Sequence, residues 1–248
     1  MTLETDLQVL NTLPISSWKY PRIALAIPIE RAISHAGIVF YNFLYIASQA
    51  PWFIEAPYGR IDIVRNNIAI QLLKSQCTHV LMLDVDHKHP VRIIQEFAKW
   101  AMIRPDAQVI SGLNFRRGEP YDPVAGNLSD SGKREILTEW KPGLTPYDEV
   151  GGASLFVHRN VFETLPPPWF TNTYTKAWED NYPGEDIGFC HKCTDYGIPV
   201  YVDSQITSPH CADTLVTEKT FRAFMSMHPE RFQDVYTELD ESVPQTPE

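Results

Sequence analysis

The chain has 248 residues, of which 44% are hydrophobic and 21% are charged, as in an ordinary soluble globular protein. This length fits one large domain or two small ones, and it suffices for a buried core. The formal net charge of −10 repels phosphate groups, so the composition disfavours general binding to nucleic acids and anionic membranes.

The sequence contains no apolar stretch long enough to cross a membrane, since the apolar run at 23–29 is far too short. Residues 1–13 are acidic rather than basic and lack the apolar centre of a signal peptide. Four cysteines are too few for a disulfide scaffold. We therefore expect a cytoplasmic protein with reduced thiols.

The first half of the chain alternates between strand and helix patterns after an irregular lead-in. The predicted elements are a strand at 23–29, helices at 32–48 and 61–75, a strand at 79–83, a helix at 90–103 and a strand at 108–113. The strand at 79–83 is apolar throughout, as expected for a strand covered on both faces. This alternation predicts an α/β fold with a mostly parallel central sheet flanked by helices.

The second half of the chain has a different character. Residues 117–146 are rich in Gly, Pro, Asp and Ser, which indicates a functional loop. The elements predicted here are a short strand at 135–140, a strand at 149–159, a rigid break at 166–170, a helix at 184–197, a strand at 198–203 and a helix within 217–236. We expect these strands to form a short antiparallel addition, and the tail after Leu239 to be frayed.

Two carboxylates end the apolar strand in the stretch VLMLDVD. Asp84 and Asp86 follow the strand directly, and ligands bind outside the carboxyl ends of strands in a parallel sheet. Residues two apart on an extended chain point to the same side, so both carboxylates can share one cation. Such oxygen ligands suit Mg²⁺ or Mn²⁺. An isolated D-x-D is common, however, and a solvated strand end with a helix N-cap is the alternative.

The stretch RIDIVRNN places Asp62, Arg65 and Asn66 on one face of a predicted helix. An arginine with two hydrogen-bonding neighbours near a strand end suits a nucleotide. The alternative is an intrahelical Asp–Arg pair, which contributes only a few tenths of a kcal/mol.

Two glycine-containing motifs follow in the second half. Gly151 and Gly152 begin an apolar strand, which indicates close approach by a ligand or backbone, or else a bulge. In NYPGED, Gly184 precedes Glu185 and Asp186 in the first turn of a helix, where the helix dipole favours ionised carboxylates. An ionised carboxylate in a cleft can accept a proton from a hydroxyl, although ordinary charge complementarity at a helix start also explains the pair.

The order of these motifs resembles the GT-A glycosyltransferases. A strand ending in D-V-D is followed by a glycine pair, by G-E-D and by a lone histidine, His210 in TSPHCAD. The likeness is greatest to inverting members such as galactosyltransferases and family 2-like enzymes, and it covers about residues 23–210. It implies a GT-A (Rossmann-like) fold and a hexosyltransferase activity.

The resemblance also implies roles for individual residues. Asp86 and His210 are the metal ligands, and Asp84 contacts the ribose or a metal-bound water. Asp186 is the catalytic base and Glu185 a neighbour that binds sugar or acceptor. The residues expected around the nucleotide sugar are Pro28, Glu30, Arg31, Asp62, Arg65, Asn66, Asp84, Val85, Gly151 and Gly152.

The resemblance further implies one domain over 1–248. It has a nucleotide-sugar-binding half at 21–116, an acceptor-binding and catalytic half at 117–215, and a C-terminal helix and tail at 216–248. The implied cofactor is Mn²⁺ or Mg²⁺, and the favoured donor is a UDP-sugar. Arg116 or Arg117 can help to bind the leaving group.

The acceptor is a molecule with a free hydroxyl: a glycan, a lipid-linked sugar, a small metabolite, a protein or a modified nucleic-acid base. Trp169 and Trp178 lie just before the expected base, and their flat rings can stack on a sugar, with packing as the alternative.

Other ligand sets and functions compete with this interpretation. His87 and His89 flank the acidic pair, but a histidine beside a turn is more often solvated. Cys190-x-x-Cys193 suggests zinc superficially, yet no second pair follows and buried core cysteines explain the helical stripe better. A metal-dependent phosphohydrolase or nucleotidyltransferase remains open, although there is no P-loop. A nucleotide-binding module without turnover is the third reading.

Overall fold

The computed structural model describes residues 21–29, 38–130, 132, 134–171, 184–212 and 215–232. The strands are β1 (Ile23–Ala26), β2 (Trp52–Ile54), β3 (His79–Leu83), β4 (Val109–Asn114), β5 (Ala125–Gly126), β6 (Leu144–Tyr147), β7 (Glu149–Val150), β8 (Ser154–His158), β9 (Val200–Ser208), β10 (His210–Cys211) and β11 (Leu215–Val216). The helices are α2 (Ile38–Gln49), α3 (Ile61–Lys74), α4 (Ile93–Ile103), α5 (Arg159–Thr164), α6 (Glu185–Asp195) and α7 (Glu218–Met227), with a 3₁₀ turn at η2 (Pro229–Arg231).

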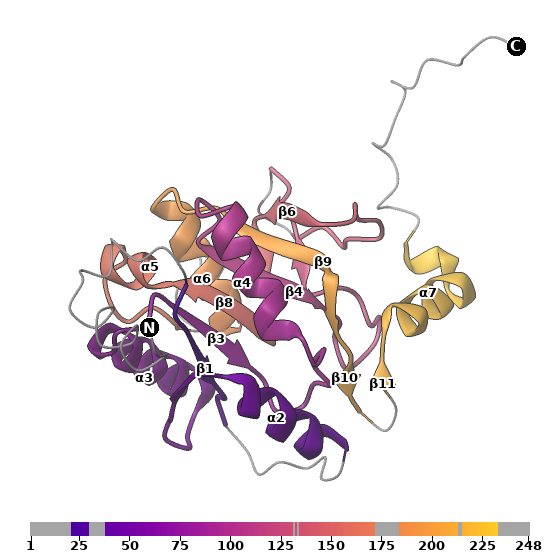
Figure 1. Cartoon of the computed structure of the whole chain (residues 1–248). Coiled ribbons are helices and arrows are strands. Elements are labelled where there is room, and N and C mark those ends of the chain that lie inside the picture. Colours follow the sequence, from indigo (N-terminus) through magenta and orange to yellow (C-terminus); the bar gives the residue numbers. More distant parts are fainter. Residues whose placement is uncertain are drawn as a thin grey trace, which may run out of the picture.

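A seven-stranded sheet forms the centre of the molecule, with helices on both faces (Figure 1). Its strand order is β2-β1-β3-β8-β4-β9-β6, and two short ribbons, β10-β11 and β5-β7, accompany it. The predicted fold class is confirmed: a mostly parallel α/β sheet flanked by helices, with antiparallel additions from the second half. No described helix is both long and apolar enough to cross a membrane.

The first half of the chain follows the predicted alternation. β1, β3 and β4 occupy the predicted strand positions, and β2 adds a strand between the first two helices that pairs in parallel with β1. β1 also pairs in parallel with β3. The carboxyl ends of these strands therefore lie along one edge, as the sequence analysis requires of a binding site.

An antiparallel strand lies in the middle of the sheet rather than at its border. β8 pairs antiparallel with β3 on one side and with β4 on the other. The stretch predicted as one strand at 149–159 is divided, because residues 151–153 separate β7, which pairs with β5, from β8. The glycine pair is thus a break at which the chain passes between two sheets.

The strand predicted at 135–140 is wrong. These residues are not part of a strand, although Ile136, Leu137 and Trp140 pack against the core. Two of these side chains are adjacent in sequence, so the segment lacks the alternation of a half-buried strand. The edge position beside β9 is taken by β6, which pairs with it antiparallel.

The two faces of the sheet bury two separate apolar clusters. Leu81 and Leu83 of β3 belong to the cluster that contains α2 and α4 residues. Val80 and Met82, which alternate with them, belong to the larger cluster with α3, α5 and α6. Asp84 continues the second set, because side chains two apart share a face. The first aspartate therefore emerges on the α3 and α6 side of the sheet.

The segment after β3 is hydrogen-bonded to the residues that follow the carboxyl end of β9. His87 forms an isolated antiparallel bridge with His210. The Lys88 N–H donates to the Pro209 carbonyl at 2.9 Å, and the Cys211 N–H donates to the Asp86 carbonyl at 2.8 Å. These backbone bonds bring the D-V-D motif and the late histidine together.

Candidate metal and carboxylate site

Asp86 lies between two histidines at the strand-end edge. Its Oδ1 is 2.9 Å from His87 Nδ1, and its Oδ2 is 3.1 Å from His210 Nε2. Within the described parts of the chain, Asp86, His87 and His210 form the one group of three side chains close enough to hold a metal ion. Burial alone would raise the pKa of the Asp86 carboxyl, but its hydrogen bonds to His210 and His87 outweigh burial and hold that pKa well below its usual range.

The two histidines differ in what their second nitrogens and rings contact. His210 Nδ1 is 3.1 Å from the Phe115 carbonyl, and in the neutral tautomer that donates to this carbonyl the lone pair on Nε2 faces Asp86, so that a metal ion can take the place of an Nε2 proton. The ring of His87 is buried and stacks on His210 with centroids 4.0 Å apart. A metal-ligating histidine usually donates its other ring N–H to a carbonyl or carboxylate, so the Phe115 contact favours His210 as the ligand, with His87 as a donor to Asp86.

His89 has a structural role. Its Nδ1 is 2.9 Å from Ser208 Oγ and its Nε2 is 2.9 Å from the Asp84 carbonyl, so both nitrogens are occupied. Burial lowers the pKa of His89 to about 3, which keeps the ring neutral. His210 was predicted as a ligand ahead of both early histidines, and the structure separates these two: His87 lies in the group that could hold a metal and His89 does not.

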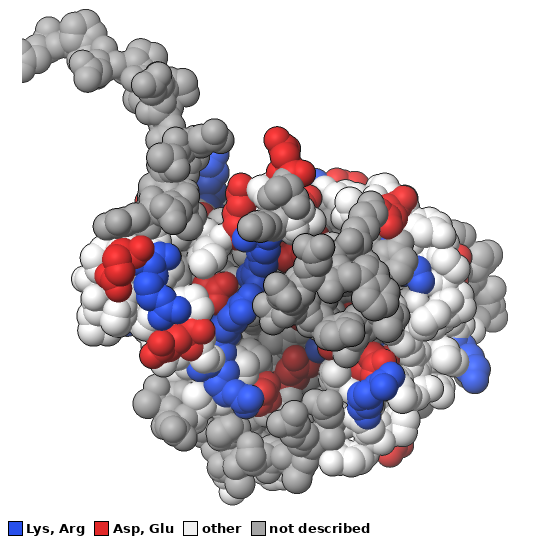
Figure 2. All heavy atoms as spheres, turned by 180° about the vertical axis from the view of Figure 1, so that it is seen from behind, with Lys and Arg blue, Asp and Glu red and all other residues white. Residues whose placement is uncertain are grey.

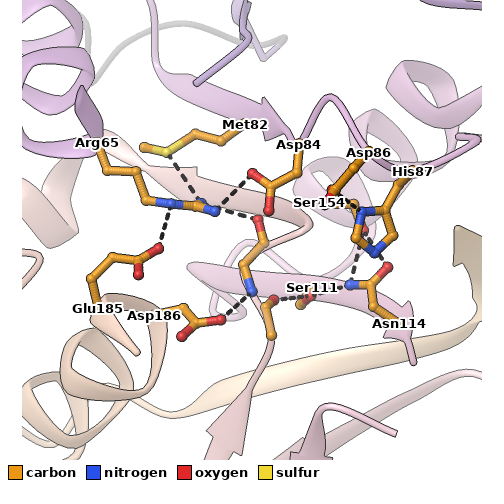
Figure 3. A network of polar contacts seen from close by, with 12 residues as sticks. Arg65, Met82, Asp84, Asp86, His87, Ser111, Asn114, Ser154, Glu185 and Asp186 are labelled. Carbon is orange, nitrogen blue, oxygen red and sulfur yellow. Dashed lines mark hydrogen bonds and ion pairs between the residues drawn. The ribbon is translucent and has the colours of Figure 1, made fainter. Parts of the chain in front are cut away.

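A second cluster surrounds the buried guanidinium of Arg65 (Figure 3). Its Nη2 donates to Asp84 Oδ1 at 2.8 Å, its Nη1 donates to the Gly152 carbonyl at 3.0 Å, and its Nε lies 3.0 Å from Glu185 Oε1. Burial raises the pKa of Asp84 to about 7 against the opposing charge of Arg65. Burial likewise raises the pKa of Glu185. The two aspartates of D-V-D thus belong to different clusters.

The G-E-D motif begins α6 and points its two carboxylates differently. Glu185 is buried against Arg65, whereas Asp186 is only partly buried. Asp186 accepts hydrogen bonds from the Gly152 N–H and from the Ile187 N–H, both at 2.9 Å. Asp186 is therefore held in place by backbone donors and remains reachable from outside, as a proton acceptor must be.

Asp62 and Asn66, which were predicted near the nucleotide, have partners within the protein. Asp62 forms a two-fold ion pair with Arg60 at 2.6 Å. The Asn66 amide binds the backbone of Trp169 and Phe170, which anchors that segment to α3. Pro28 is buried just after β1, and Val85 lies between the two aspartates. The predictions for Glu30, Arg31 and Trp178 fall outside the described residues.

Burial bears on the predictions for Trp169 and for the two cysteines of α6. Trp169 is 5% exposed and its indole N–H donates to the Phe162 and Leu165 carbonyls, so it presents no free ring face to an acceptor. We therefore withdraw it as an acceptor-binding residue, and its packing alternative holds. Cys190 and Cys193 are buried core residues, and burial raises the pKa of both thiols.

Two contributions to the site could not be read from motifs. The Ser111 hydroxyl donates to the Gly151 carbonyl at 2.6 Å and so holds the break between β7 and β8 in place. The only sign of this role in the sequence is a single hydroxyl residue within an apolar strand. Arg117 has a 3.9 Å contact to Asp86 and a half-exposed side chain. Figure 2 shows acidic and basic side chains gathered around a hollow on the face turned away from the view of Figure 1. This arrangement can bind a ligand that carries both a cation and negative charge.

A cavity of about 550 Å³ lies elsewhere, at the other end of α6. Its lining includes Tyr147, Thr194, Ile198 and Pro199. Because α6 begins at Glu185 and ends at Asp195, the helix separates this cavity from the carboxylates. The cavity is therefore not the site to which the motifs belong.

The comparisons with known proteins agree with the architecture. No known family profile matches the chain, and no curated protein sequence matches it significantly. Among solved structures, A197 from STIV is similar with a TM-score of 0.52 and 16% identity, over 77% of this chain and 86% of that one. This likeness shows the fold.

Glucosyl-3-phosphoglycerate synthase from Mycobacterium tuberculosis, solved with Mn²⁺ and UDP-glucose, aligns with a TM-score of 0.46 and 9% identity, over 92% of this chain and 84% of that one. CMP:2-keto-3-deoxy-manno-octonic acid synthetase aligns with a TM-score of 0.44 and 10% identity, over 84% and 99% of the two chains.

Proposed function

We propose that this chain is a metal-dependent glycosyltransferase that moves a sugar from a nucleotide-sugar donor, preferably a UDP-sugar, to an acceptor hydroxyl. The observation that carries the proposal is the meeting of Asp86 Oδ2 and His210 Nε2 at 3.1 Å, between residues 124 positions apart. This pair lies beyond the carboxyl end of β3. The same D-V-D motif supplies Asp84 to the neighbouring cluster, where Arg65 also contacts Glu185 and the Gly152 carbonyl. The Gly152 N–H in turn donates to Asp186.

The Asp86–His210 pair fits a divalent cation. In the neutral tautomer of His210 that donates from Nδ1 to the Phe115 carbonyl, the Nε2 lone pair faces a carboxylate, and two such acceptors repel unless a cation or proton lies between them. Adjacent ligands at about 2.1 Å from an octahedral ion lie about 3.0 Å apart, close to the observed separation. A carboxylate with an imidazole suits Mn²⁺ better than Ca²⁺.

When bound, the ion would neutralise the negative charge that develops on the leaving nucleoside diphosphate. Arg117, 3.9 Å from Asp86, is placed to donate to the same phosphates. Asp84 and Val85, together with Pro28 and Asp62 at the ends of β1 and the start of α3, would contact the nucleoside. These residues bind and orient the donor.

Asp186 would act as the base. Both its oxygens accept backbone hydrogen bonds, which fixes the carboxylate while lone pairs remain for an incoming hydroxyl. Its place in the first turn of α6 sets the carboxylate at the positive end of the helix dipole. The acceptor hydroxyl would give its proton to Asp186 as its oxygen bonds to the anomeric carbon, while the bond from that carbon to the nucleoside diphosphate breaks on the opposite face. A single displacement of this kind inverts the configuration.

A melting-temperature screen tests the proposal. UDP-, GDP-, dTDP- and CMP-sugars are added with and without Mn²⁺, and a ligand that binds the folded state raises the melting temperature. We expect at least one nucleotide sugar to stabilise the protein in the presence of Mn²⁺ only. The donor with the largest shift is then incubated with the enzyme, and release of its nucleoside diphosphate is measured.

The products separate the competing functions. Nucleoside diphosphate release from a sugar donor supports a glycosyltransferase, whereas pyrophosphate release from a nucleoside triphosphate and a sugar would identify a nucleotidyltransferase. Nucleotide binding that is indifferent to Mn²⁺, without turnover, would identify a binding module. For variants that replace a carboxylate of the site by its amide, Asp106→Asn is the matched control, because Asp106 is an exposed carboxylate paired with Arg104 before β4.

A further inference from the structure

Arg65 is a charged side chain almost completely removed from solvent. It is 1% exposed, and its guanidinium lies 6.0 Å from the centre of the Phe170 ring. Each of its three nitrogens has a protein partner: Asp84 for Nη2, the Gly152 carbonyl for Nη1, and Glu185 for Nε. A side chain in this position has little capacity to contact a ligand in the open part of the site.

The partners of Arg65 come from three different parts of the fold. Asp84 follows β3, Gly152 lies in the break before β8, and Glu185 begins α6. The Gly152 peptide is shared by two groups, because its carbonyl accepts from Arg65 and its N–H donates to Asp186 Oδ2 at 2.9 Å. The position of Asp186 therefore depends on Arg65 through one peptide and one adjacent residue.

The glycines of the two motifs make room for this arrangement. A Cβ at Gly152 would lie 2.8–2.9 Å from three atoms of the Arg65 guanidinium, closer than real Cβ contacts allow. A Cβ at Gly184 would lie 2.6 Å from Asp186 Oδ1. The close approach that the sequence predicts at Gly152 is thus made by an arginine of the same chain.

Charge balance explains why an arginine is buried here. Moving a guanidinium out of water is costly unless carboxyl groups pair with it, and Asp84 and Glu185 do so at 2.8 and 3.0 Å. An arginine also fixes geometry better than a lysine, because its planar fork donates in several directions at once. The arrangement is suited to holding three elements in register.

We infer that Arg65 is a positioning residue that acts on Asp186 through the Gly152 peptide and Glu185, and that it does not contact the nucleotide. This inference rests on the proposed function and replaces the nucleotide-binding role that the sequence suggested for Arg65. Its consequence is a division of labour: Asp86 and His210 determine binding, and Arg65 determines the rate of the chemical step.

The test compares Arg65→Met, Arg65→Lys and Gly152→Ala. The measurements are kcat and KM for UDP-glucose, or for the donor that the screen selects, and the Kd of UDP with Mn²⁺ by calorimetry. We expect Arg65→Met to lower kcat on the order of 100-fold, as a small displacement of a catalytic group does. The Kd should change less than twofold, and Arg65→Lys should restore part of kcat.

Gly152→Ala keeps the arginine but fills its space, so it should lower kcat with the Kd unchanged even if Arg65→Met does not fold. Arg104→Lys, an exposed arginine in a pair with Asp106, is the control and should match the wild type. A Kd weakened tenfold or more by Arg65→Lys with kcat unchanged would make Arg65 a nucleotide contact and overturn the inference. Wild-type kcat in all variants would also overturn it.

Failure of the proposed function gives a different result. If the wild type neither transfers nor hydrolyses any sugar donor, the proposed function is refuted, and the positioning role is refuted with it. If the wild type is active and the variants are equally active, only the inference about Arg65 is refuted.

Discussion

The two aspartates of the D-V-D motif, Asp84 and Asp86, lie in two clusters of opposite electrostatic character. Asp84 is paired with a buried guanidinium at 2.8 Å and its charge is already compensated. Asp86 Oδ2 faces Nε2 of His210 at 3.1 Å, a pair of atoms that a cation or a proton can bridge. One cluster is an ion-pair network around Arg65, and the other is a group of side chains that could hold a metal ion. A D-x-D motif is therefore not a unit, and its two carboxylates can serve different purposes.

The largest effect should come from Asp86→Asn. The neutral amide leaves only His210 as a strong ligand, so we expect transfer to fall on the order of 10³-fold, with Mn²⁺ no longer raising the melting temperature. Activity and thermal shift measured together check this. Full activity with Mn²⁺ in the variant would remove Asp86 from the metal site and with it the contrast between the clusters.

Asp186→Asn tests the opposite cluster. Loss of the base should lower kcat by about 10²–10³-fold while the Kd of UDP with Mn²⁺ stays unchanged, because the amide keeps the shape of the side chain but cannot accept the proton. Steady-state kinetics and calorimetry on the same preparation provide the comparison. A weakened Kd with normal kcat would place Asp186 with the ligands instead.

His87→Gln should have a smaller effect within the metal cluster. If His87 orients Asp86 by donating from Nδ1, its loss should weaken Mn²⁺ binding about tenfold, as the loss of an outer hydrogen bond to a metal ligand does. Titration of Mn²⁺ in the presence of UDP measures this. A loss as large as that of Asp86→Asn would show that His87 is itself a ligand.

The smallest effect concerns His79, a buried histidine at the other end of β3 that stacks on Phe156. Burial holds the pKa of His79 well below 6.5, with the nearby His158 acting in the same direction. Below pH 6.5 the unfolded chain therefore binds a proton that the folded protein does not. Its contribution to the free energy of unfolding should fall by about 1.4 kcal/mol per pH unit as the pH is lowered through this window.

Urea unfolding of the wild type and of His79→Phe at pH 7.5, 6.0 and 5.0 checks this sign. The phenylalanine variant should gain stability relative to the wild type as the pH falls. A constant difference between the two proteins would mean that the pKa of His79 is the same in the folded and unfolded states, and it would contradict this prediction. His79 could then no longer serve as the buried, neutral histidine with which the histidines beside Asp86 are compared.

Local sequence pattern was sufficient to predict most of the first half of the fold, but not the short strand β2. The apolar run at 79–83 predicts a strand and the helical spacing at 61–75 predicts a helix, and the structure has β3 and α3 at these positions. The central position of β8 could not be predicted, because strand order depends on tertiary packing and not on local pattern. The strand expected at 135–140 failed because adjacent apolar residues can pack on a core without joining a sheet.

The site was predictable where a motif carried its chemistry. The sequence singled out Asp84, Asp86, Glu185 and Asp186 as candidates, and the resemblance to a family pointed to His210; the structure places these residues in two adjoining clusters, and their roles stay predictions. The partner of each carboxylate was not predictable, because Arg65 appears equally suited to a nucleotide when only its helix is considered. Burial decides between these partners, and burial is a property of the whole fold.

Calorimetric titration of UDP into the wild-type protein, with and without Mn²⁺, tests the central claim most directly. If Asp86 and His210 hold a divalent ion that binds the diphosphate, UDP should bind at least tenfold more tightly with Mn²⁺, and His210→Ala should abolish that gain. Equal affinity with and without the metal, or a gain that survives His210→Ala, would contradict the account.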